Sequence, residues 1–172
     1  GGADSTDALD GLNDPTVQRR LAAADVVVVE LGANDFDEGS ADDPACSHPQ
    51  TDDCFADNLR TMTTNLRRLV AAIHALPRPP DARIVLVGYW NVFRDGEVGR
   101  ARGDTYVANS ARLTDAVNAA ILDVARRNGE LYADALAPFK GNGSLDATFA
   151  LSPDGNHPNA RGHRLLADAV VA

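Results

Sequence analysis

The sequence predicts an α/β domain in which helices cover both faces of a parallel sheet. The run "ADVVVVELG" at 24–32 is apolar and β-branched, as expected of a strand covered on both faces, and "ARIVLVGYW" at 82–90 is a second continuous apolar run. Helical patterns separate the strand-like runs, so the predicted order is strand, helix, strand, helix, strand, helix. Such alternation is typical of a parallel sheet packed between helices.

The first predicted helix runs from Phe55 to Leu76, between these two strands. Its apolar residues recur at helical spacing, and "PRPP" at 77–80 ends it, since proline cannot continue a helix. The apolar positions are Leu59, Met62, Leu66, Leu69, Val70 and Ile73.

Two further helices and a weaker strand complete the predicted order. The Gly/Arg-rich stretch 95–106 is expected to be a loop, and the helix after it ends at "RNG", 127–129. A strand is expected at 130–135, and after a loop at 138–157 the last helix begins at about Pro158, at or near its first helical position. The inner faces of these two helices carry Leu113, Val117, Ala120, Ile121 and Val124, and Leu165, Leu166, Ala169 and Val170.

Length and composition fit one globular domain spanning residues 1–172. The chain is 44% hydrophobic and 24% charged, and its net charge of −9 is spread along the sequence without a block of like charges. This charge argues against a nucleic-acid partner, and no apolar run approaches the ~18 residues of a membrane span. We expect the protein to be a monomer.

The two cysteines, Cys46 and Cys54, lie in the polar stretch "DDPACSHPQTDDCF". A disulfide between them would close a short loop and favours a secreted protein, because disulfides persist outside the cytosol. Two free thiols remain an alternative. So does a metal site formed with His48, although the ligand count and spacing fit no common zinc pattern.

Two loops at the carboxyl ends of the strands carry residues suited to chemistry. Ligands of parallel α/β sheets bind at this edge, where Gly32 and Asn34 leave the first strand and Asp154 and His157 precede the last helix. A histidine acts as a general base when a carboxylate orients its ring, and an asparagine amide can stabilise an oxyanion. Taken singly, a turn-forming asparagine and a solvated histidine in a helix-entry loop explain the same residues.

The two loops together resemble a known family. "ELGANDF" resembles the G-x-N-D block, and "SPDGNHPNARGH" the D-x-x-H-P block, of the SGNH or GDSL hydrolases, which include esterases and lipases. The resemblance extends from Gly2 to the last helix. It implies the flavodoxin-like three-layer fold of that family, with helices on both faces of a parallel sheet, and no metal or organic cofactor.

Residue by residue, the resemblance assigns four positions. His157 matches the family's catalytic base and Asp154 the acid that orients it, while Asn34 matches a side-chain oxyanion donor. The opening "GGADSTDAL" is similar to the block whose glycine offers a backbone N–H to the oxyanion, which makes Gly2 the match and Gly1 the other choice.

The family's nucleophile has no match in this chain. It lies in a G-D-S block after the first strand, upstream of the oxyanion glycine, so the resemblance implies a first strand and a nucleophilic serine before Gly1. "GADS" at 2–5 echoes that block, but no strand precedes Ser5, and its distance from Gly32 suits the glycine block better.

The function expected from the resemblance is hydrolysis of carboxylic esters through an acyl-enzyme. Two alternatives from other classes stay open at this point. One is a non-catalytic binding module that keeps the fold, and the other is a metal-dependent hydrolase using Asp154, His157 and His163.

Overall fold

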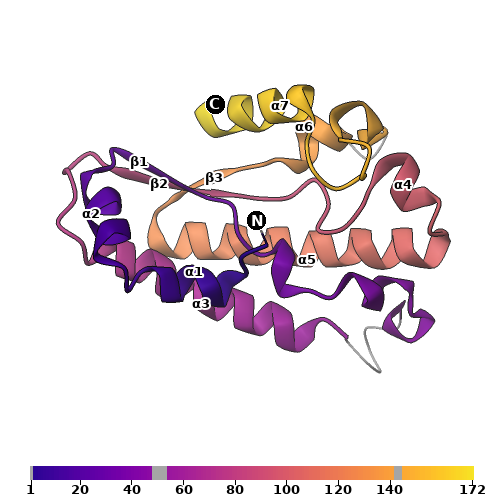
Figure 1. The fold of residues 1–172 in the computed structure, drawn as a ribbon, viewed down its shortest axis with the longest axis horizontal. Helices are drawn as coiled ribbons and strands as arrows, with labels where there is room; N and C mark the ends of the chain where they lie inside the picture. Colours follow the sequence, from indigo (N-terminus) through magenta and orange to yellow (C-terminus); the bar gives the residue numbers. More distant parts are fainter. Residues whose placement is uncertain (1, 48–53, 142–144) are drawn as a thin grey trace.

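A computed structural model describes residues 2–47, 54–141 and 145–172, and at its centre is a three-stranded parallel sheet (Figure 1). The strands are β1 (Val26–Val29), β2 (Arg83–Val87) and β3 (Leu131–Ala133), in the order β1-β2-β3. Each strand is shorter than its apolar run. The parallel order confirms the predicted fold class.

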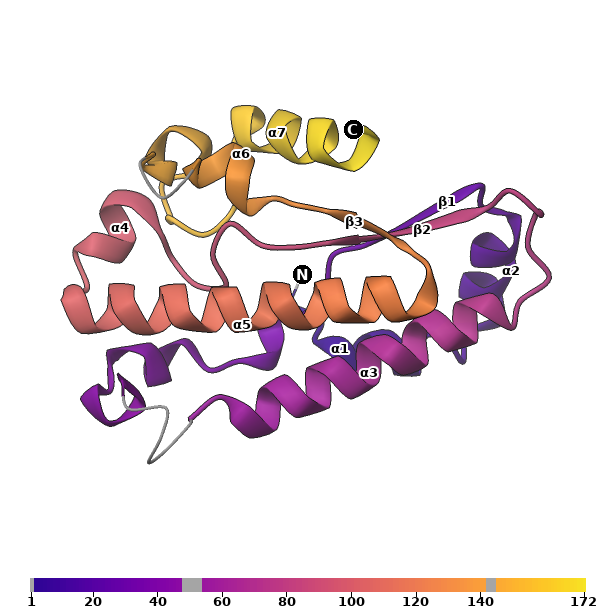
Figure 2. The same cartoon turned by 180° about the vertical axis from the view of Figure 1, so that it is seen from behind.

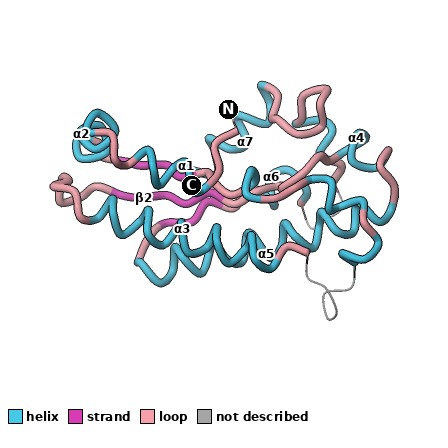
Figure 3. The backbone as a smooth tube through the Cα atoms, turned by 60° about the horizontal axis from the view of Figure 1, so that its bottom comes forward, coloured by secondary structure: helices cyan, strands magenta, loops and turns pink. Residues whose placement is uncertain are grey.

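Helices cover both faces of this sheet, as the order of elements predicted. In Figures 1 and 2 the helices α1 (Ser5–Gly11), α3 (Ala56–His74) and α5 (Asp104–Asn128) lie on one side, and α6 (Leu136–Lys140) and α7 (Ala160–Val171) on the other. Figure 3 shows the strands as a narrow magenta band among helical segments. None of the described helices is both long and apolar enough to cross a membrane.

The side chains of the strands alternate between two apolar cores. Val27, Val29 and Leu86 belong to the core on the side of α3 and α5, whereas Val85 and Val87 belong to the core against α6 and α7. β1 is poorly covered on the side of α6 and α7, where the side chains of Val26 and Val28 are 54% and 50% exposed. Within the described residues, β1 pairs with β2 alone and its other edge is unpaired.

The stretch 95–106 is not a single loop, which corrects the prediction from its glycines. It contains the short helix α4 (Gly96–Arg100) and the first residues of α5. Gly96 serves close packing: a Cβ on it would lie 2.9 Å from the Thr148 backbone nitrogen. Local composition favoured a loop because this contact is tertiary.

Three helix starts show how local capping sets the boundaries. The prediction omitted α1 and α2 (Pro15–Ala23), although the Asp4 carboxylate caps α1 by accepting from the Thr6 and Asp7 N–H groups, and Asp14 caps α2. α7 begins at Ala160, where the Asn159 side chain caps it, so Pro158 lies just outside the helix.

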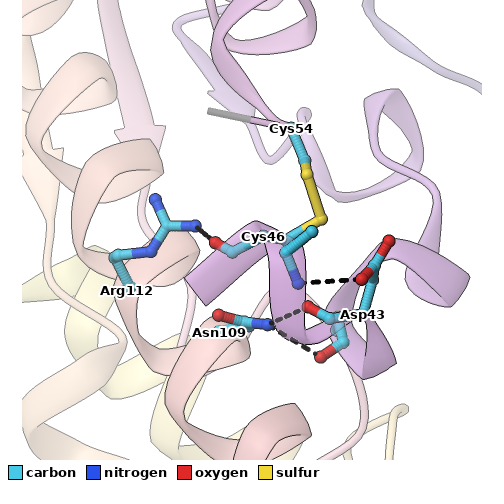
Figure 4. Close-up of a disulfide and its surroundings, with 7 residues drawn as sticks. Asp43, Cys46, Cys54, Asn109 and Arg112 are labelled. Atoms are coloured by element: carbon cyan, nitrogen blue, oxygen red, sulfur yellow. Dashed lines mark hydrogen bonds between the residues drawn. A yellow bond between two sulfur atoms is a disulfide. The ribbon is translucent and has the colours of Figure 1, made fainter. Parts of the chain in front are cut away.

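Cys46 and Cys54 form the predicted disulfide, with Cα atoms 5.4 Å apart (Figure 4). His48, the third member of the alternative metal site, lies outside the described residues. Side chains of α5 hold this region: Arg112 donates to the Cys46 carbonyl, and Asn109 donates to the Asp43 carbonyl at 3.2 Å.

Candidate active site

Asp154 and His157 form a hydrogen-bonded pair at the start of the last helix. The His157 Nδ1 atom lies 2.7 Å from Asp154 Oδ2, while Asp154 Oδ1 accepts from the N–H groups of Asn156 and His157 at 2.9 and 3.0 Å. These backbone hydrogen bonds, together with the one to the His157 ring, lower the pKa of Asp154 to about 2. Asp154 is therefore a carboxylate at any ordinary pH and can only accept, so His157 Nδ1 carries the proton and Nε2 is free to act as a base.

Contacts with α4 and α6 fix the position of this loop. Gly155 adopts φ +71°, and its carbonyl accepts from the Asp95 N–H at 2.8 Å. Asp95 is in turn paired with Lys140 of α6 at 2.7 Å. The contacts with Asp95 thus hold the backbone of the loop that carries His157. The His157 side chain itself is 75% exposed.

Asn34 lies in the short turn after β1, opposite the histidine loop. Gly32, at φ +137°, directs the chain into a 3₁₀ turn at Ala33–Asp35. The Asn34 Nδ2 atom donates to the Ala3 carbonyl at 3.0 Å, which uses one of its two hydrogens and leaves the other available. Asn34 therefore sits against the segment that contains Gly2, whose φ of +95° favours glycine.

Ser5 is a structural residue of this N-terminal segment. It is 2% exposed, and its backbone N–H and its hydroxyl both donate to the Asp35 carboxylate, at 3.1 and 2.5 Å. Asn65 donates to the same hydroxyl at 2.9 Å. Burial raises the pKa of Asp35, while the hydrogen bonds from Ser5 oppose that rise. This buried network uses the donor hydrogen of the Ser5 hydroxyl and one of its two acceptor sites.

A cavity of about 290 Å³ joins the two loops. Asn34 and His157 both line it, which brings together the two motifs singled out in the sequence. Asp154 and Gly2 do not belong to its lining. The full lining comprises Glu30, Ala33, Asn34, Tyr89, Trp90, Asn91, Val92, Asn156, His157, Pro158, His163 and Leu166.

The cavity is also lined by Glu30, which had no predicted part, and by His163, which was named for the alternative metal site. Burial raises the pKa of Glu30, and the electrostatic interaction with His163 opposes that rise. His163 lies on α7 and His157 precedes this helix, and both line the cavity. Among the described residues, no group of three or more His, Cys, Asp or Glu side chains is arranged to hold a metal ion.

The segment after β2 forms the remaining wall, and side chains of α5 hold its backbone. The Tyr89 N–H donates to the side-chain oxygen of Asn118 at 2.7 Å, and the Val92 N–H donates to the Thr114 hydroxyl at 3.0 Å. The Arg94 N–H donates to the Tyr106 hydroxyl at 2.9 Å. Trp90 serves the core as well as the cavity, because its ring stacks on Phe139 at 4.5 Å.

Sequence reasoning missed Asn91, a buried side chain of the same wall. Its side-chain oxygen accepts from the Thr114 hydroxyl and from the Phe93 N–H, both at 3.2 Å, and from the Ser110 hydroxyl. The one available signal was position, since Asn91 follows the second strand at the edge where Asn34 follows the first.

Comparison with known proteins gives a family match over most of the chain. The model of the GDSL-like lipase/acylhydrolase family matches residues 1–165. The chain belongs to this family. No curated protein sequence matches the chain.

Solved structures show the same fold as this GDSL-family chain. Axe2, an acetylxylan esterase from Geobacillus stearothermophilus, is 22% identical with a TM-score of 0.59, and 98% of this chain aligns with 66% of Axe2. LAE5, an α/β hydrolase from the metagenome of Lake Arreo, is 23% identical with a TM-score of 0.61, again over 98% and 66%. A protein of Parabacteroides merdae described as a GDSL-like lipase has a TM-score of 0.68 at 17% identity, over 99% and 68%. The chain thus spans about two thirds of the length of these structures.

Proposed function

We propose that this protein is a serine hydrolase of carboxylic esters whose nucleophile lies upstream of Gly1. The observation that carries the proposal is the cavity shared by Asn34 and His157, with His157 oriented by Asp154 at 2.7 Å. A base with a free ring nitrogen and an amide donor across one cavity are the parts that acyl transfer requires.

The reaction would proceed in two halves. His157 Nε2 takes the proton of the serine hydroxyl as that oxygen attacks the ester carbonyl, and the resulting oxyanion accepts from Asn34, from Gly2 N–H and from the serine's own N–H. When the intermediate collapses, His157 returns the proton to the leaving alcohol, and an acyl-enzyme remains. Water then repeats the sequence and releases the acid.

The described serines support a nucleophile from outside residues 1–172. None of the serines in the described ranges lines the cavity, and Ser144 lies outside those ranges. Ser5 and Ser110 are buried in hydrogen-bond networks, and Ser152 faces the Pro158 carbonyl. The unpaired edge of β1 and the exposed Val26 and Val28 also suit a further strand and helix beside β1.

Axe2 offers a second line of support. The Axe2 residues whose variants are described as catalytic are a serine, an aspartate and a histidine. The aspartate precedes the histidine by three positions, as Asp154 precedes His157 here. The serine precedes that aspartate by more than 170 positions, a longer stretch than the one ahead of Asp154 in this chain.

The substrate would be a small-molecule, lipid or carbohydrate ester, and the enzyme a secreted monomer. Axe2 is described as an acetylxylan esterase, which makes acetylated carbohydrates the first class to assay. The Cys46–Cys54 disulfide supports export, because such bonds persist in oxidising compartments.

Serine-directed labelling of the full-length protein tests this proposal. A fluorophosphonate should modify one serine upstream of Gly1, and His157→Ala should abolish that labelling because the serine loses its base. Residues 1–172 alone should not hydrolyse activated short-chain esters. Labelling of a serine within 1–172 would contradict the proposal, and a full-length protein that neither labels nor hydrolyses would favour a binding module.

A further inference from the structure

Asn91 has a fixed oxygen and a free amide nitrogen. Its oxygen accepts from Phe93 N–H and from the Ser110 and Thr114 hydroxyls. The Phe93 N–H can only donate, so the atom facing it must be the oxygen, and this settles which way the amide points. The two Nδ2 hydrogens have no partner among the described residues.

The free nitrogen faces open space, although Asn91 is 94% buried as a whole. Within the described part of the chain, the side-chain atoms that are sealed from solvent and lack a partner do not include Asn91 Nδ2. This nitrogen therefore contacts solvent. Asn91 is 6% exposed, and the space it borders is the cavity lined by Asn34 and His157. The unpaired donor therefore reaches solvent through that cavity.

A molecule bound against this donor must offer it an acceptor, because binding removes the solvent that would otherwise pair with it. An apolar group placed there would leave the amide hydrogens unpaired at a cost in affinity, whereas an oxygen acceptor would pair with them. The hydrogen bonds from the Phe93 N–H and the Ser110 hydroxyl hold the amide in advance, so little side-chain entropy is lost when the bond forms.

We propose that Asn91 is a specificity-determining residue that selects esters whose alcohol part carries a further oxygen, such as esters of sugars or other polyols. This inference rests on the proposed function and deepens it. His157 must hand its proton to the leaving alcohol, so the alcohol part lies in the cavity that His157 and Asn91 share. Asn34 donates to the acyl carbonyl oxygen. The Asn91 hydrogens can then pair with a further oxygen of the alcohol part.

The experiment compares two acetate esters in the full-length enzyme. One is a mono-acetylated methyl xyloside, and the other is cyclohexyl acetate, which has a ring of similar size and no further oxygen. Asn91→Asp keeps an oxygen for Phe93, Ser110 and Thr114 and removes both N–H donors. We expect kcat/KM for the sugar ester to fall about 10-fold or more, and that for cyclohexyl acetate to change less than about 3-fold.

Asn118→Asp is the matched control, because it makes the same chemical change against the same backbone segment. Asn118 holds Tyr89 through its oxygen and its nitrogen, at 2.7 and 2.8 Å, and does not line the cavity. It should lower the melting temperature and leave the ratio of the two kcat/KM values unchanged.

Each outcome decides the matter. Equal losses on both esters in Asn91→Asp, or no loss on either, would overturn the role of Asn91 and leave the hydrolase in place. A change of the same size in the ratio for Asn118→Asp would also overturn it, because the effect would then come from the segment as a whole. An unmodified enzyme inactive on both esters and on activated esters would refute the proposed function itself.

Discussion

The carboxylate of Asp154 holds His157 twice, through the ring Nδ1 at 2.7 Å and through the backbone N–H at 3.0 Å. One side chain thus sets both the path of the loop and the orientation of the imidazole. The two oxygens divide these tasks, with Oδ1 on the backbone and Oδ2 on the ring.

This division makes Asp154→Asn a selective change. The asparagine oxygen can still accept from the two backbone N–H groups, but its NH₂ group faces Nδ1 and favours the wrong ring tautomer. We expect kcat of the full-length enzyme to fall about 1,000- to 10,000-fold, with a small drop in melting temperature at neutral pH because the charge of the carboxylate is lost. Steady-state kinetics and thermal unfolding check this, and a kcat within 10-fold of the original would remove Asp154 from the proposed mechanism.

The lowered pKa of Asp154 predicts a dependence of stability on acid. The folded-state pKa is about 2, below the ordinary value of 3.8, so folding favours the carboxylate. The stabilisation is present above about pH 4 and is lost as the pH falls toward 2. Denaturant titrations between pH 5 and 2 should therefore show a steeper loss of unfolding free energy in the original protein than in Asp154→Asn. Parallel curves would contradict the assignment of that pKa to this contact.

Substitutions at Asn34 and Ser5 should have different effects. The first should lower activity, and the second should lower stability. Asn34→Ala removes an oxyanion donor, and we expect kcat to fall about 100- to 1,000-fold. Ser5→Ala removes a buried hydroxyl that Asp35 and Asn65 share, so unfolding free energy should fall by about 1–3 kcal/mol while kcat stays the same. Loss of turnover in Ser5→Ala without unfolding would make Ser5 the nucleophile.

Gly155 and Gly129 offer a matched pair of substitutions at the same backbone angle. Both adopt φ +71°, but a Cβ on Gly155 would lie 2.5 Å from Val98 Cβ, whereas nothing lies within 4 Å of one on Gly129. Gly129→Ala should cost roughly 1 kcal/mol of stability with kcat unchanged. Gly155→Ala should cost more and should also lower kcat, because the clash displaces the loop that carries His157. Equal effects of both substitutions would show that the Val98 contact does not position the loop.

The disulfide should contribute to stability without contributing to catalysis. Replacing both Cys46 and Cys54 by alanine should lower the unfolding free energy by about 2–3 kcal/mol, since the bridge closes a short loop. Neither cysteine lines the cavity, so kcat should not change. Alkylation before and after reduction, followed by intact mass measurement, should label no thiols and then two. Labelling of both without reduction would refute the bridge.

The parts of the fold that depend on nearby residues were predictable from the sequence. Alternation of apolar runs and helical patterns predicted the parallel sheet, and a spacing of three placed Asp154 within reach of His157. The place of Asn34 at the cavity was predictable because this residue follows a strand at the edge where ligands bind. α1 also carried a local signal, the pair Asp4 and Asp7, which a search for capping boxes would have detected.

Asn91 could not be predicted, because its role depends on distant partners. Ser110 and Thr114, which anchor its oxygen, lie 19 and 23 positions further along the chain. Only the packing of α5 under the segment after β2 brings them together. The same reason explains α4, where Gly96 fits a tertiary contact with Thr148.

The backbone of residues 89–94 is shaped by another element of the chain. Three of its N–H groups donate to side chains of Asn118, Thr114 and Tyr106, all on α5. Protein engineers who transplant this segment to alter substrate preference would move its amino acids without the groups that set its conformation. A successful graft must therefore carry the matching α5 side chains, and mutant libraries should vary the segment and the helix face together.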